Sequence, residues 1–174
     1  MRSPIKRVED KTSFRAVMLT VIFLLSWLEA MVPLGVPGVK FGFSNLVILI
    51  CLTEYGFREA LAMAVLKILM STVLFNGFSA FLYTMGGAFA SCCSMGLAIR
   101  LYETKKISTI GVSAIGGFFH ITAQYVIAAY TLYTPSVFAL YPPAATLTLV
   151  TSAVMGFLAA KIIKQLHTIS YDYE

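Results

Sequence analysis

The sequence predicts an all-α integral membrane protein, a bundle of about six transmembrane helices with both termini in the cytoplasm. Composition is the first observation, because 59% of the 174 residues are hydrophobic and 12% are charged, against roughly 25% charged in a soluble domain. The second is a succession of apolar runs that approach or reach the roughly 17 to 25 residues a membrane helix needs. The third is the gathering of lysine and arginine in alternate connections. No room remains for a soluble domain.

The expected spans are separated by short polar or glycine- and proline-containing connections. The first ends where GVPGVK places glycine and proline residues that cannot continue a helix. The second is short, so we expect it to be tilted or shielded by its neighbours. We expect a transmembrane domain of residues 16–163, followed by a cytosolic tail of residues 164–174. Residues 1–15 are expected to be a retained cytosolic leader, because no small-residue cleavage site follows the first apolar run. The spans cover residues 16–34, 43–56, 59–75, 80–101, 108–131 and 144–163.

Basic residues predict the orientation, because they accumulate on cytoplasmic connections. With both termini inside, the outer face keeps Lys40. An odd number of spans would place the C-terminal lysines outside, so the charge pattern favours an even count. The same rule accounts for the net charge of +5, and we expect no nucleic-acid partner. The inner face holds Arg2, Lys6, Lys11, Arg15, Arg58, Arg100, Lys105, Lys106, Lys161 and Lys164.

Ionisable and amide side chains inside the spans predict a ligand site. A charge in hydrocarbon costs at least about 2.5 to 3.5 kcal/mol, so such groups face the bundle interior, a partner or a water-filled cavity. His120 and Gln124 are four residues apart and share one helix face. All these groups fall at mid-depth or in the outer half, which favours a cavity open to the exterior. The predicted substrate-binding residues are Glu29, Lys40, Asn45, Lys67, His120 and Gln124.

Lys67 is the centre of this hypothesis. A lysine at mid-depth cannot easily reach either interface, so it needs a partner, water or the loss of its proton. We expect Glu29 to be its counter-charge and an anionic ligand group to bind it. Aromatic residues near the outer surface could stack on a ligand ring or belong to the ordinary interfacial belt; they are Phe41, Phe43, Tyr130, Tyr133 and Tyr141.

Two other interpretations use the same residues. Glu29 and Lys67 could form a purely structural pair, with His120 and Gln124 holding helices together by hydrogen bonds. A proton relay through Glu29 and His120 is chemically possible, but a transporter working alone usually contains internal repeats, and the sequence has none. The cysteines, Cys51, Cys92 and Cys93, fall inside spans and are expected to pack as small hydrophobes, and we expect no catalytic or metal site.

The connection GVPGVKFGFSN is expected to cover the outer mouth of the cavity as a lid. Its apolar residues Val36, Val39, Phe41 and Phe43 suit a solvated loop poorly. Gly35, Gly38 and Gly42 permit the turns that tuck it inward.

The run LEAMVPLGVPGVKFGFSNLVILICLTEYGFREALAMAVLKILMSTVLFNG, followed by GGFFHITAQ, resembles the bacterial Gx transporter family, also labelled heptaprenyl diphosphate synthase component I. The likeness covers roughly residues 20 to 163. It includes the glutamate before the loop, the G-x-x-E-A turn at Gly56 to Ala60, the mid-helix lysine, and the His and Gln of the fifth span. Ile121 stands where the resemblance leads us to expect an asparagine.

That family resembles the S components of energy-coupling factor transporters. The resemblance implies a multi-pass protein of the bacterial cytoplasmic membrane that captures a vitamin or cofactor precursor from outside. It would then dock on a transmembrane coupling subunit that works with two ATPases; the counterparts of the docking residues are Ala16 and Thr20. The chain has no P-loop with which to power transport itself. We therefore expect a binding subunit that is not an enzyme and carries no cofactor.

The synthase label supplies an alternative of another class. Prenyl transfer between diphosphates needs clustered aspartates to hold Mg²⁺, and the aspartates here are Asp10 and Asp172, one in each tail. Under this label the chain would be an accessory membrane subunit that presents an isoprenoid or quinone to a separate prenyl synthase or redox partner.

Overall fold

The computed structural model describes residues 8–32, 35, 38–76 and 81–172, and this part of the chain is all-α. The third helix continues directly into a π-helical turn, η1, and a short 3-10 helix, η3, precedes the last helix. The elements are α1 (Val8–Met31), α2 (Phe43–Tyr55), α3 (Phe57–Ser71), η1 (Thr72–Asn76), α4 (Phe81–Glu103), α5 (Thr109–Thr131), η3 (Pro135–Leu140) and α6 (Tyr141–Asp172).

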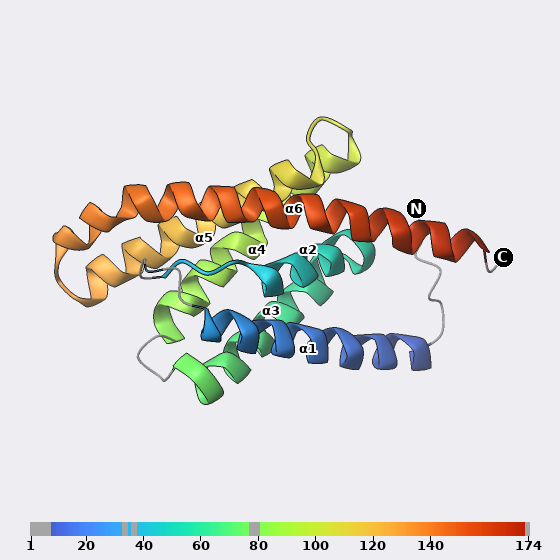
Figure 1. The fold of residues 1–174 in the computed structure, drawn as a ribbon, viewed down its shortest axis with the longest axis horizontal. Helices are drawn as coiled ribbons and strands as arrows, with labels where there is room; N and C mark the ends of the chain where they lie inside the picture. Colours follow the sequence, from blue (N-terminus) through green and yellow to red (C-terminus); the bar gives the residue numbers. More distant parts are fainter. Residues whose placement is uncertain (1–7, 33–34, 36–37, 77–80, 173–174) are drawn as a thin grey trace.

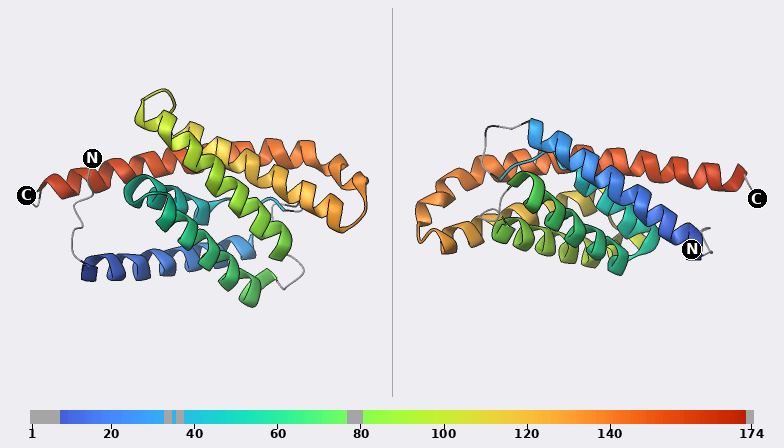
Figure 2. Two further views of the ribbon diagram at one scale, coloured as in Figure 1. Left: turned by 180° about the vertical axis from the view of Figure 1, so that it is seen from behind. Right: turned by 90° about the horizontal axis from the view of Figure 1, so that it is seen from below.

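The helices run back and forth along one axis, so connections gather at two ends (Figure 1). One end, here called the terminal end, holds the start of α1, the α2–α3 turn, the α4–α5 turn and the end of α6. The opposite end holds the α5–α6 connection and the end of α1. Figure 2 shows the same arrangement from behind and from below. The described residues form six α-helices, an even number, so Val8 and Asp172 lie at the same end.

Three segments of the described residues are long and apolar enough to cross a membrane: Phe81–Glu103, Thr109–Thr131 and Pro135–Thr168. They make the protein a multi-pass membrane protein. α2 is apolar but spans 13 residues, about 20 Å of helix, which is less than the roughly 30 Å hydrocarbon core. α1 carries charged residues near its two ends, and α3 carries Arg58, Glu59 and Lys67. The expectation of six crossings thus stays a prediction for these three helices.

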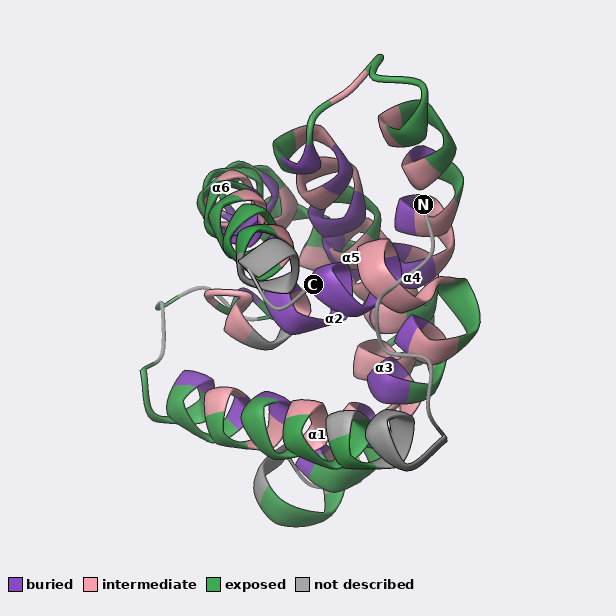
Figure 3. Ribbon diagram, turned by 90° about the vertical axis from the view of Figure 1, so that its right-hand side faces the viewer, coloured by how far each residue is buried: buried purple, intermediate pink, exposed green. Residues whose placement is uncertain are grey.

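Burial explains how α2 can be both apolar and short. All residues from Leu46 to Leu52 are buried, and α2 contacts α1, α3, α4 and α6. Figure 3 shows the buried positions of α2 among the other helices. A helix that is apolar all round belongs in an interior. The neighbours of α2 therefore shield it, which is one of the two solutions expected for the short second span.

The ends of α1 and α6 differ from the expected spans. α1 begins at Val8 rather than at residue 16, and α6 runs from Tyr141 to Asp172 rather than over 144–163. The connection expected to be a loop also contains η3. Proline is tolerated in the first turn of a helix, where its missing N–H has no partner to lose, so Pro142 and Pro143 begin α6 instead of preceding it.

Close approach of α5 and α6 depends on Gly156. A Cβ added there would lie 2.7 Å from Ile110 Cα and 3.1 Å from the carbonyl oxygen of Thr109. Backbone atoms cannot move aside as a flexible side chain can. The small residue at this position therefore sets how near the start of α5 comes to α6.

Candidate functional site

Lys67 of α3 is the centre of a polar cluster inside the helical bundle. Its Nζ donates a hydrogen bond of 3.0 Å to Oδ1 of Asn45 on α2. Glu29 of α1 is buried at 5% exposure, and its carboxylate lies within electrostatic range of Lys67, as does the ammonium group of Lys40. Three helices and the segment before α2 thus contribute to one site.

The α5 side of this cluster consists of His120 and Gln124. The charges of Lys67 and Lys40 both act on the His120 ring, and the backbone of Gly87 on α4 lies within hydrogen-bonding reach of it. Nδ1 of His120 and Oε1 of Gln124 are buried and have no hydrogen-bond partner among the described residues. Buried polar atoms are normally hydrogen-bonded, so this pair of atoms is the feature of the site that most needs explanation.

Residues 38–42, here called the cover segment, lie over the α5 side chains. Val39 is 6% exposed and packs in one buried cluster with Ile121, Tyr125, Ala144 and Ala145. The segment runs back along the bundle toward α2 (Figure 1). Non-helical backbone at membrane depth occurs where it is buried in protein or lines a cavity. The cover segment is therefore part of the wall of the site.

Gly38 fixes the contact between the cover segment and α5. Its φ of +81° belongs to the left-handed region, and a Cβ there would lie 3.0 Å from Gln124 Oε1. Phe41 and Phe43 stack on each other with ring centroids 5.6 Å apart. The packing of Val39 agrees with the inward-folded loop expected from the sequence; Val36 lies outside the described residues, and the closing motion of a lid stays a prediction.

The structure brings all six predicted site residues into one region, from α1, the cover segment, α2, α3 and α5. The sequence predicted Glu29 as the counter-charge of Lys67, and the charge of Glu29 does act on Lys67. The direct hydrogen bond from Lys67 to Asn45 was not predicted. Ile121 is fully buried against the cover segment cluster. The isoleucine where asparagine was expected therefore contributes packing rather than a polar lining.

The aromatic residues divide into two groups. Tyr141 donates to or accepts from Thr122 Oγ1 at 2.8 Å and packs edge-on against Tyr125 with centroids 5.6 Å apart. Tyr130 and Tyr133 are 80% and 87% exposed, which is typical of interfacial aromatics. Tyr125 was not among the sequence candidates. Its position four residues after Ile121 on the same α5 face was the available signal.

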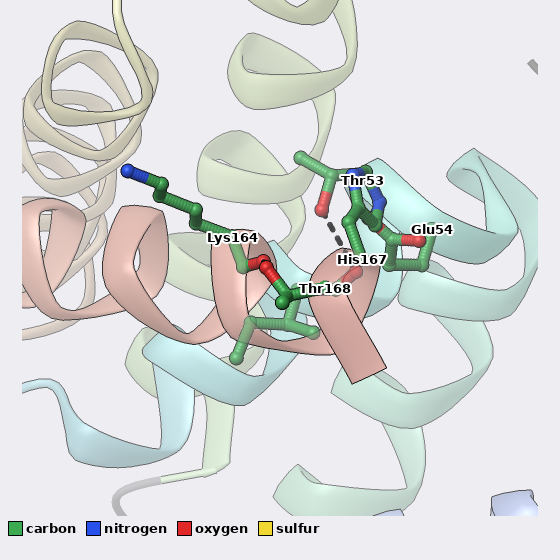
Figure 4. Close-up of polar contacts among 6 residues, drawn as sticks. Thr53, Glu54, Lys164, His167 and Thr168 are labelled. Carbon is green, nitrogen blue, oxygen red and sulfur yellow. Dashed lines mark hydrogen bonds and ion pairs between the residues drawn. The ribbon is translucent and has the colours of Figure 1, made fainter. Parts of the chain in front are cut away.

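A second polar group lies at the terminal end, where the sequence predicted no site. His167 Nε2 of α6 and Glu54 Oε1 of α2 are 3.0 Å apart, and Figure 4 shows the His167 ring beside Thr53 and Glu54 while Lys164 extends away from them. An adjoining pocket of about 370 Å³ is lined by Tyr102, Thr109, Ala160, Ile163, Lys164, His167 and Thr168. This contact links the ends of α2 and α6.

The expected docking residues lie on an exposed part of α1. Thr20 Oγ1 donates to the carbonyl oxygen of Ala16 at 2.9 Å, so its hydroxyl is used within the helix. Nearby, Arg15 forms an ion pair with Glu59 of α3. Hydrogen bonding to that carboxylate, and its charge, raise the pKa of Arg15. The pair joins α1 to the start of α3.

Comparison with known proteins gives one family. Neither curated proteins nor solved structures returned a match. The family model described as heptaprenyl diphosphate synthase component I matches residues 18–162, which include every predicted site residue. This match covers most of the chain, and with the long apolar helices it shows that the chain is a membrane protein belonging to the heptaprenyl diphosphate synthase component I family.

Proposed function

We propose that this chain is the membrane-embedded substrate-binding subunit, or S component, of an energy-coupling factor importer, and that it is not an enzyme. Its ligand would be a vitamin or cofactor precursor taken from outside the cell. The observation that carries the proposal is the convergence of six polar residues from five segments on one region, in which Glu29 is buried, Lys40 is exposed and the other four are half-buried. Intramembrane ionisable residues are costly and are functional candidates by default.

The orientation in the proposal follows from charge. Six crossings place both termini, Arg58 and Lys105 at the cytoplasmic face and Lys40 at the outer face. The terminal end of the bundle would then be the cytoplasmic end, and the cover segment would approach the site from outside. The protein would lie in the bacterial cytoplasmic membrane with lipid around α4, α5 and α6.

Partners are proposed on the same basis. The chain has no P-loop sequence, so transport would depend on a transmembrane coupling subunit and two ATPases. α1 presents large apolar side chains that are 42 to 58% exposed at Val17, Leu24, Trp27, Leu28 and Met31. Such a surface suits contact with lipid or with an apolar helix of a coupling subunit.

The test is to purify the tagged full chain from its native membrane in mild detergent and to identify bound small molecules by mass spectrometry. We expect a water-soluble cofactor-like compound, and we expect the coupling subunit and ATPases in the same preparation. Lys67→Met should bind the compound too weakly to keep it through purification. Lys106→Met, which changes an exposed lysine in the α4–α5 turn, is the matched control and should keep it.

The family's description favours a second candidate, an accessory subunit that presents an isoprenoid or quinone to a separate prenyl synthase or redox partner. In that case the same preparation would carry a prenyl lipid or quinone together with a prenyl synthase or redox partner, and no coupling subunit. Adding the chain in vesicles to that synthase would raise its rate of prenyl transfer. An S component would leave the rate unchanged.

A further inference from the structure

The charges around Lys67 leave the candidate site with an excess of positive charge. Lys67 and Lys40 each carry an ammonium group, and Glu29 supplies a carboxylate within electrostatic range of Lys67. Asn45 is neutral and accepts a hydrogen bond from Lys67. Glu29 is buried, Lys67 is half-buried and Lys40 is exposed at the edge of the site, so the two cations and one anion sum to one positive charge where the site meets its surroundings. An anionic ligand group lying beside both ammonium groups would neutralise it.

The opposite side of the site needs hydrogen-bond donors. A neutral imidazole has one N–H, and the Gly87 backbone lies within reach of the His120 ring, so the unpartnered Nδ1 acts as an acceptor. Oε1 of Gln124 is an amide oxygen and can only accept. These two buried atoms, here called the acceptor pair, lie one turn apart on the same face of α5. Both require an N–H or O–H group.

We propose that the ligand is a small monoanion whose far end carries N–H or O–H donors. Its carboxylate lies beside Lys67 and Lys40, and its donors bind the acceptor pair beneath the cover segment. This inference rests on the proposed function and narrows its ligand class. A quinone has neither an anionic group nor donors, and a prenyl diphosphate has no donor end, so neither satisfies both sides of the site.

The experiment uses the purified full chain in nanodiscs and a library of water-soluble metabolites that includes acids, phosphates and neutral compounds. Compounds that raise the melting temperature are measured by calorimetry, each beside its ester and its N- or O-methylated analogue. We expect the stabilising compounds to be monoanions with donors. Esterification and methylation should each weaken binding by about tenfold or more, as expected for a hydrogen bond lost to a buried partner.

Two variants then assign each end of the ligand. In Lys67→Met, esterifying the ligand should cost little further affinity, because the partner of the anionic group is already gone. In Gln124→Leu, methylating the ligand's donors should likewise cost little further affinity, as expected for coupled partners in a double-mutant cycle. Lys106→Met and Gln165→Leu change exposed residues away from the site and should leave both penalties unchanged. The comparison of ligand analogues on the unaltered protein stands even where a variant fails to fold.

Stabilisation by neutral compounds, equal binding of a methylated analogue, or a methylation penalty that Gln124→Leu leaves intact would overturn the proposed ligand class. The importer proposal would survive those results, because a water-soluble ligand would still bind. If no water-soluble compound stabilises the protein, both proposals fall.

Discussion

At the scale of single residues, the environment of Lys67 determines what its substitution would do. The ammonium group has an amide partner in Asn45 and a carboxylate in Glu29 nearby. Replacing it with methionine keeps most of the side-chain volume but leaves the buried Glu29 charge with one fewer cation. Removing one member of a buried charged group is more costly than removing both.

We therefore predict that Lys67→Met lowers the stability of the protein by roughly 1 to 3 kcal/mol and that adding Glu29→Gln restores most of it. If Lys67 contacts the ligand, the stable double variant still binds it far more weakly than the unaltered protein does. The test measures the melting temperature and the ligand affinity of Lys67→Met, of Glu29→Gln and of the double variant. Full ligand binding by a stable double variant would remove Lys67 from the site.

At the scale of elements, the position of the cover segment depends on how Gly38 and Val39 meet α5. We predict that Gly38→Ala displaces this segment, because the new Cβ meets Gln124 Oε1 at 3.0 Å with φ at +81°. Ligand affinity should fall, and the amides of residues 39–41 should exchange faster with deuterium. Gly35→Ala is the matched control, since Gly35 has a similar φ of +73° but nothing within 4 Å of its added Cβ. Equal effects of the two variants would mean that backbone strain alone, not the contact with α5, is responsible.

Helix packing supplies a second prediction at this scale. Gly156→Ala should lower the free energy of unfolding by roughly 1 to 3 kcal/mol, as overpacking does, because its Cβ would lie 2.7 Å from the Ile110 backbone. Gly111→Ala on the facing helix places its Cβ an ordinary 3.5 Å from Ile107. That control should be neutral or slightly stabilising, since alanine favours helix by about 1 kcal/mol over glycine. Denaturation in detergent compares the two, and an unchanged Gly156→Ala protein would contradict the packing argument.

At the scale of the whole molecule, the predicted orientation can be measured. After Cys51, Cys92 and Cys93 are replaced by alanine, single cysteines at Lys40 and Ser136 should react with an impermeant maleimide in intact cells. A cysteine at Lys105 and one at the C-terminus should react only after permeabilisation, because basic residues remain in the cytoplasm. Labelling of the C-terminal cysteine in intact cells would contradict six crossings.

The overall order of helices could be predicted from the sequence, because glycine, proline and charge interrupt the apolar runs. The ends of α6 could not, since Pro142 and Pro143 read as loop residues although a first helical turn accepts them. The six polar residues of the candidate site could be singled out from the sequence because intramembrane polar side chains are few, and their binding of a ligand stays a prediction. The bond from Lys67 to Asn45 could not be predicted, because it depends on how two helices are rotated toward each other. Tyr125 was missed because its spacing of four residues from Ile121, the available signal, is shared by any aromatic residue that simply packs on an apolar helix face.

The burial of residues 46–52 of α2 also bears on how the protein enters the membrane during synthesis. With 13 residues, α2 is too short to be held across a bilayer by its own contact with lipid. Only Gly56 separates it from α3, which itself carries Lys67 and cannot easily stand alone in lipid. With six crossings, we therefore expect the two helices to leave the insertion machinery as one hairpin and to reach their final position once the later, strongly apolar helices have enclosed them.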